Sequence, residues 1–225
     1  MKRLLITVMA MTMAFATCYG QERTREEINK ERKEIRKMAK EELTDKVDKT
    51  TRKEAKKLEE EGWRVKPGAL PLAKQLEKSY LMQMEFDEDL YPKYLMGEAS
   101  SIGENYDAAK VSALSLAITN LAGQIQTEVS ALVENTVANS QLSAGDATSI
   151  TKTIMSSKNL ISQSIGRTLT VVECYRINSK GNNEVLVRIF YSGKMAKQTV
   201  QNSIREQLEK EGDNLGEELD KILAE

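Results

Sequence analysis

The chain has 225 residues, with 33 basic and 34 acidic side chains, and its net charge of −1 at pH 7 gives no reason to expect a nucleic-acid partner. It contains no histidine, which excludes Ser-His-Asp and Cys-His catalysis, histidine-ligated zinc and haem bound through imidazole. Of the usual catalytic mechanisms, those that use carboxylates, lysine, tyrosine or a Ser-Lys pair remain. The composition therefore favours a protein that is not an enzyme.

Residues 1–20 have the layout of a secretory signal peptide. Lys2 and Arg3 give a basic start, the run 4–16 is mostly apolar, and charged sequence begins shortly after Gly20. The apolar run is too short for a comfortable membrane span. The sequence therefore predicts cleavage after Gly20 and export, either to the periplasm or to the outer membrane and cell surface.

Cys18 allows a second interpretation, in which it is the lipidated first residue of a bacterial lipoprotein. Such signals usually carry leucine three residues before the cysteine and glycine or alanine directly before it, whereas Phe15 and Thr17 stand here. We favour plain cleavage and keep lipidation of Cys18 as the alternative. The other cysteine, Cys174, alternates with apolar residues, so it is expected to be a buried small hydrophobe rather than a reactive thiol.

Residues 21–61 form a charged helical arm in our interpretation. Charged side chains fill 27 positions of 22–61, 14 basic and 13 acidic, and neither proline nor glycine interrupts them. A narrow apolar stripe recurs at helical spacing; its residues are Ile28, Ile35, Ala39, Leu43, Val47, Ala55 and Leu58. Three interpretations stay open: a solvated helix packing one edge on its own domain, a spacer or self-pairing arm, and disorder.

Shorter elements follow up to residue 104. Gly62 is a plausible end for the helix, and 63–65 has the character of a short strand in which Trp63 belongs to the core rather than to a ligand platform. Proline at the first turn predicts a helix over 71–84. The run 90–99 predicts a strand.

The clearest element is a long amphipathic helix over 105–138, capped by Asn105 or Asp107. Its apolar stripe is carried by Val111, Leu114, Ile118, Leu121, Ile125 and Leu132. Its polar face has hydroxyl and amide side chains where Lys and Glu are usual: Ser112, Ser115, Thr119, Asn120, Gln124, Gln126, Thr127 and Ser130. We therefore expect either a low-charge surface or an interaction face that includes Ser112, Ser115, Thr119 and Gln126.

The rest of the chain predicts a second helix over 146–164, a hairpin of strands over 168–177 and 184–191, and a helical end broken near 212–214. The predicted fold class is α+β, with a small, mostly antiparallel sheet covered by helices and a long charged N-terminal helix. We place the main domain at 62–200 and a C-terminal helix at 201–225.

A family resemblance is carried by a strand that closes on Gly97-x-Ala99, an alanine-spaced helix, a Ser/Thr-rich helix, and strands at 169–172 and 185–188. The helix residues that carry it are Ala109, Ala113, Ala117, Leu121, Ala122, Ile125, Val129, Leu132 and Val133. Over 91–192 the chain resembles the bacterial small outer-membrane lipoprotein family, whose domain recurs at the start of a flagellar outer-membrane ring protein. The resemblance implies an α/β envelope domain with scaffolding or adhesive roles and no catalytic residues.

Motifs with possible chemistry are weak. Ser149 and Lys152 match the S-x-x-K nucleophile motif, but no K-T-G or S-D-N accompanies them. The acidic cluster at 85–89 fits no calcium loop, and no Gly-Lys-Ser/Thr follows Gly103 to make a phosphate loop. We expect no catalytic, cofactor or metal site. The expected function is that of an exported, non-enzymatic envelope protein that binds another envelope protein or itself. Association with the outer membrane is included in this expectation. The alternative is a periplasmic small-ligand or glycan binder that uses Trp63 and the tyrosines.

Overall fold

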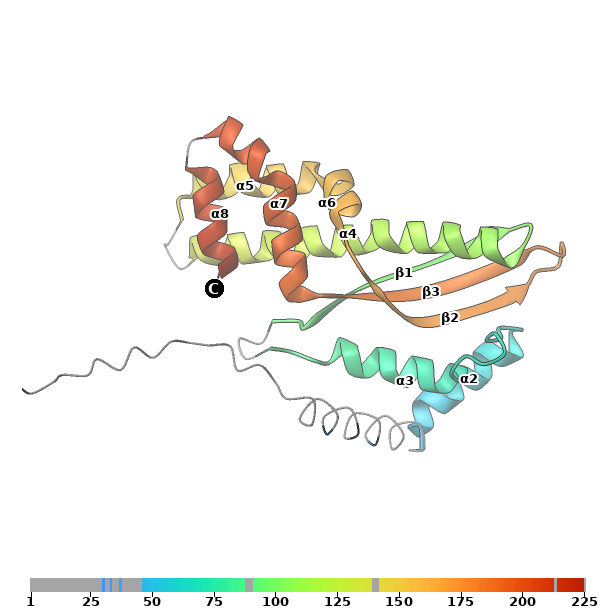
Figure 1. Ribbon diagram of the computed structural model, residues 1–225. Helices are drawn as coiled ribbons and strands as arrows, with labels where there is room; N and C mark the ends of the chain where they lie inside the picture. The colour runs from blue at the N-terminus through green and yellow to red at the C-terminus, as the bar shows by residue number, and fades with distance from the viewer. Residues whose placement is uncertain are drawn as a thin grey trace, which may run out of the picture. The chain divides into compact units, whose positions relative to one another are not determined.

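The computed structural model describes residues 46–87, 91–138, 142–212 and 214–224, together with Lys30, Lys33 and Lys37. The chain divides into two units, Met1–Lys46 and Val47–Glu225, and the architecture below is that of the second. Its described residues form seven helices and one three-stranded antiparallel sheet, so the predicted α+β class is confirmed (Figure 1). The predicted signal peptide, including Cys18, lies outside the described residues.

The sheet has the strand order β1-β3-β2, with β3 (Asn183–Ser192) in the centre and β1 (Tyr94–Gly103) and β2 (Leu169–Ile177) at the edges. The predicted hairpin is confirmed as β2 and β3. In its turn, the Asn178 side-chain oxygen accepts hydrogen bonds from two backbone amides, and Gly181 has a φ of 80° that favours glycine. Strand β1 begins later than predicted, at Tyr94, and it also ends later, because residues 100–103 continue the pairing with β3.

Helices cover both faces of this sheet because the strand side chains alternate. Val185, Val187 and Ile189 of β3 point into one cluster, which contains the buried residues of α4 (Tyr106–Ala138). Phe190 points into a second cluster with buried residues of α2 (Lys49–Glu60) and α3 (Leu72–Gln83). The helices predicted over 71–84 and 105–138 are thereby confirmed.

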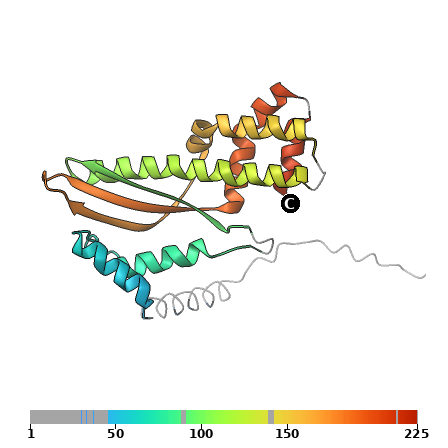
Figure 2. The same ribbon diagram turned by 180° about the vertical axis from the view of Figure 1, so that it is seen from behind.

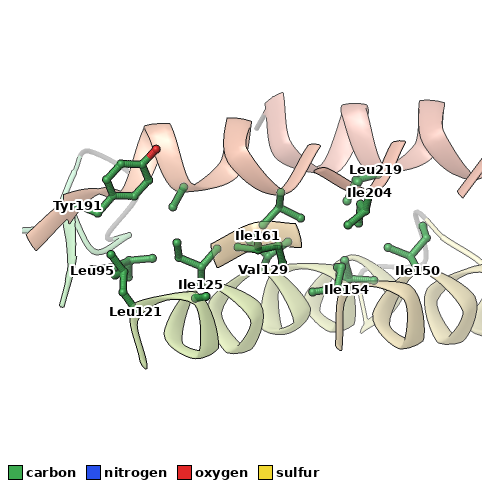
Figure 3. Packing of buried hydrophobic residues seen from close by; sticks show 14 of the residues in the cluster. Leu95, Leu121, Ile125, Val129, Ile150, Ile154, Ile161, Tyr191, Ile204 and Leu219 are labelled. Carbon is green, nitrogen blue, oxygen red and sulfur yellow. The ribbon is translucent and has the colours of Figure 1, made fainter. Parts of the chain in front are cut away.

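The second half of α4 extends past the sheet into a helical layer (Figure 2). It packs there with α5 (Ala144–Ser156), α6 (Lys158–Ser164), α7 (Gly193–Glu211) and α8 (Leu215–Ala224). Figure 3 shows the apolar side chains that fill this layer, with Ile125 and Val129 of α4 facing side chains of the other helices. The helix predicted over 146–164 begins at Ala144 and is two helices.

Ser157 separates α5 from α6, and its hydroxyl donates a 2.8 Å hydrogen bond to the Gln207 side chain of α7. This hydrogen bond attaches the junction between α5 and α6 to α7. The predicted interruption of the C-terminal helix near residue 212 is confirmed, since α7 ends at Glu211 and α8 begins at Leu215. Helix α7 crosses the predicted boundary at residue 200 without interruption, and its Ile204 and Leu208 belong to the core.

The charged segment 21–61 differs from a single continuous helix. Residues 46–48 are not helical, and the Asp48 carboxylate accepts a 2.7 Å hydrogen bond from the Thr50 amide as the N-cap of α2. Ala55 of α2 is buried in the second cluster, so this part of the segment belongs to the domain rather than to a spacer. Apart from Lys30, Lys33 and Lys37, which are exposed, the prediction for 21–45 lies outside the described residues.

Candidate functional site

Helix α4 lies unusually close to strand β1. A Cβ atom on Gly97 would come within 2.2 Å of the Ala117 carbonyl oxygen and 2.8 Å of the Leu121 Cβ. The helix presents Ala109, Ala113 and Ala117 to the sheet, and all three are fully buried. Small side chains on both elements therefore let the two backbones approach, and they fix which side of α4 turns inward.

The opposite side of α4 is exposed over its first half. We define the outer face of α4 by six residues of this side: Ala108, Val111, Ser112, Ser115, Leu116 and Thr119. Val111 is 68% exposed and Leu116 is 48% exposed. No charged residue occurs between Lys110 and Glu128. The outer face thus combines exposed aliphatic side chains with hydroxyls and carries no charge, which is uncommon for a solvated helix.

The structure corrects the predicted interaction face at Gln126. This side chain is 3% exposed, and its amide nitrogen donates hydrogen bonds of 2.6 and 3.0 Å to the carbonyl oxygens of Ile154 and Met155. Ser130 is buried as well. Helix α5 of the same chain therefore covers the second half of the polar face, because a buried amide must pair with acceptors that only a neighbouring helix end supplies.

Ser112, Ser115 and Thr119 stay together on the first half of the helix. Ser112 and Ser115 are exposed, and Thr119 is half-buried, with its hydroxyl donating a 3.0 Å hydrogen bond to the Ser115 carbonyl oxygen. Asn120, from the same predicted polar face, instead donates a 2.8 Å hydrogen bond to the Glu98 carbonyl oxygen of β1. The predicted face thus separates into an exposed part, a part held by β1 and a part covered by α5.

Sequence reasoning missed Val111 and Leu116 as surface residues. Val111 belongs to the predicted apolar stripe, but the structure turns it outward because the alanines occupy the side that meets the sheet. Helical spacing alone does not separate these two stripes, since each repeats every three to four residues. The signal that separates them is the recurrence of alanine every four residues together with Gly97 on the neighbouring strand.

A polar cluster joins the start of α4 to β2. Lys110 makes an ion pair of 2.8 Å with Glu173, and the Tyr106 hydroxyl donates a hydrogen bond to the same carboxylate. The Lys66 ammonium lies 3.7 Å from the centre of the Tyr106 ring. Burial alone would raise the pKa of Glu173, but the hydrogen bonds from Lys110 and Tyr106 outweigh it and lower the pKa.

This cluster has the character of a structural ion pair. Burial, with the hydrogen bond to Glu173, raises the pKa of Tyr106, so its proton is held in place rather than made available. Gln75 of α3 accepts a 2.8 Å hydrogen bond from the Glu173 amide, which ties the cluster to α3. Glu173 therefore connects β2 to α4 through its carboxylate and to α3 through its backbone amide.

Two other predictions from the sequence concern buried residues. Trp63 is 4% exposed, in the second cluster, with the Arg176 guanidinium 4.6 Å from its ring centre, so its predicted place in the core is confirmed. Arg64 beside it forms an isolated bridge with Tyr175 instead of a full strand. Cys174 is buried, as predicted, and burial raises its pKa to about 12, which keeps the thiol unreactive.

The weak chemical motifs are not assembled into a centre. Lys152 is exposed and, with Glu134, lines an open groove of about 630 Å³ between the end of α4 and α5; none of the described residues that line this groove is aromatic. Glu85 is paired with Lys93 at 2.9 Å, and the Asp87 carboxylate accepts the Tyr91 amide. In the parts of the chain that the structure describes, no acidic and cysteine side chains gather into a metal-binding group.

Comparisons with known proteins return no relative. No protein-family model matches the sequence, and no curated protein or solved structure matches it either. The resemblance to the small outer-membrane lipoprotein family therefore stays a prediction. Among the described helices, none combines the length and apolar character that a membrane crossing requires.

Proposed function

We propose that this chain is an exported, non-enzymatic protein of the bacterial cell envelope that works through protein–protein contacts. The observation that carries the proposal is the outer face of α4, where Val111 and Leu116 are exposed beside Ser112 and Ser115 without a charged residue among them. Apolar side chains exposed among uncharged hydroxyls lose little on desolvation, which suits a surface that is covered by another protein. The leader-like residues 1–20 and the family resemblance support the envelope as its location, in the periplasm or at the outer membrane.

The alternative is a periplasmic small-ligand or glycan binder, but its main candidate ligand-binding residue, Trp63, lies in the core. Glycan sites commonly use an exposed aromatic ring as a stacking surface, whereas Trp63 is buried and covered by Arg176. The described residues that line the open groove beside Lys152 include no aromatic side chain. A thermal-shift screen against envelope glycans tests this alternative, because a specific ligand raises the melting temperature of the native state.

The proposal is tested by crosslinking in cells, with a C-terminally tagged chain and mass spectrometry of what is captured. Wild type is compared with Ser112→Lys/Ser115→Lys, which places two charges on the outer face, and with Asn202→Lys on α7 as a matched exposed control. We expect a near-stoichiometric envelope protein, or a second copy, with wild type and Asn202→Lys, and its loss with the double variant. Equal capture by all three chains would contradict a role for the outer face.

A further inference from the structure

We infer that the occupant of the outer face of α4 is a second copy of this chain, packed antiparallel so that the first halves of the two α4 helices cover each other. The inference rests on the proposed function and names the partner at the same site.

The outer face is the uncovered half of a longer row. Steps of four and three residues connect Ala108, Ser112, Ser115 and Thr119 with Ala122, Gln126, Val129 and Val133 on the same side of α4. The last four residues are buried, and α5 and α6 pack against this half of the helix. Alternating steps of three and four residues are the spacing with which helices pack side by side. The row is thus a helix-packing surface that the chain itself fills only over its second half.

The chemistry of the uncovered half suits a copy of itself. Two identical faces repel each other when they carry charges of one sign, whereas none of the six residues of the outer face is charged. Each hydroxyl of Ser112 and Ser115 is both a donor and an acceptor, so identical rows satisfy each other. The small side chains at Ala108, Ser112 and Ser115 also allow two helices to approach closely.

Because α5 covers the second half of α4, the two α4 helices of a dimer can pack antiparallel but not parallel. In a parallel pair, the second halves of the two α4 helices would run along the same row, into the space that α5 fills at Gln126. In an antiparallel pair, each second half runs away past the start of the other helix. With the first halves centred on each other, Ala108 lies opposite Thr119 of the second copy, and Ser112 lies opposite Ser115 of the second copy.

This geometry is tested with single cysteines at Ala108 and Thr119, introduced into full-length chains that also carry Cys18→Ser. Cys174 is buried and stays out of reach of the oxidant. Eleven residues separate the two positions, or about 16 Å along a helix. A disulfide requires Cα atoms within about 7 Å. Under mild oxidation with diamide, we expect a covalent dimer when Ala108→Cys and Thr119→Cys chains are mixed, and no dimer when each is oxidised alone.

A charged surface should abolish this dimer. Adding Ser112→Lys/Ser115→Lys to both chains should lower the yield at least tenfold, whereas adding Asn202→Lys should leave it unchanged, with circular dichroism confirming that every variant is folded. Self-crosslinking of Ala108→Cys alone would overturn the antiparallel geometry. Failure of the mixed pair to crosslink would overturn the second copy as occupant. The proposed function would survive that failure if the crosslinking in cells still captured a different protein that depends on Ser112 and Ser115.

Discussion

Replacing Gly97 by alanine tests the contact that turns the outer face of α4 outward. The added Cβ would lie 2.2 Å from the Ala117 carbonyl oxygen and 2.8 Å from the Leu121 Cβ. The first of these atoms belongs to the backbone of a 33-residue helix, so it cannot rotate away as a side-chain end does. Either α4 or β1 must shift, and the contact between the two elements is lost in part.

The expected cost follows from overpacking in cores. Insertions into well-packed cores typically cost about 1–3 kcal/mol, and a clash with helix backbone belongs at the upper end, about 3 kcal/mol. For a domain of this size, each kcal/mol lowers the melting temperature by about 2–4 °C, so Gly97→Ala should melt about 6–12 °C below wild type. Thermal denaturation followed by circular dichroism measures this difference.

Gly123→Ala in the same helix is the matched control. Its added Cβ would meet only the flexible end of Lys158, at 3.4 Å, and alanine is the better helix former by about 1 kcal/mol. This variant should melt about 2–4 °C above wild type.

A second change, Ala117→Gly, should not rescue Gly97→Ala, because the clash involves the carbonyl oxygen rather than the alanine methyl group. A Gly97→Ala melting temperature within about 2 °C of wild type would refute the close contact.

Two further predictions concern side chains that join elements. Gln126→Ala removes the side-chain donor to the carbonyl oxygens of Ile154 and Met155, and only the Ile154 oxygen keeps another donor, the Ser157 amide. It should therefore cost about 1–3 kcal/mol in thermal melts, whereas the exposed Gln124→Ala should stay within about 0.5 kcal/mol. Glu173→Gln tests a carboxyl group whose pKa in the folded chain is lowered from the ordinary value of 4.5. A lowered pKa stabilises the folded chain at pH values above the unfolded pKa, and this stabilisation is lost as the pH falls through the folded pKa. The melting-temperature difference between wild type and Glu173→Gln should therefore be present at pH 7 and shrink below about pH 4.5; a difference independent of pH would count against the ion pair.

Elements with a strong local signal could be predicted from the sequence. The long helix, the hairpin and the break near residue 212 each combine a clear apolar period with turn residues between the elements. The interruption at residues 46–48 was missed because most residues around Asp48 are charged and neither proline nor glycine breaks the segment. Only the capping contact with the Thr50 amide marks Asp48 as the residue before a helix.

Which side of a helix faces the core was harder to predict than the helix itself. Val111 is larger and more apolar than Ala113, so transfer free energy alone places Val111 inside. The structure reverses this order, because alanine permits α4 to pack against β1 at Gly97. The prediction for Gln126 was wrong in the opposite sense. This polar side chain was expected at the surface, but it is buried where the end of α5 provides two acceptors for its amide nitrogen.

These two reversals explain how one helix can stabilise the fold and still carry the surface for which we propose a partner. The close contact at Gly97 is made with Ala117 and Leu121, and Val111 and Leu116 lie exposed, so the core does not require these two larger aliphatic residues. Substitutions at Val111, Ser112 and Ser115 can therefore change what the outer face binds at little cost in stability, as is usual for exposed positions. Gln126 lacks this freedom because α5 depends on it. Near Ala122, this side of α4 thus changes from exposed residues that the fold does not require to buried residues that α5 and α6 cover.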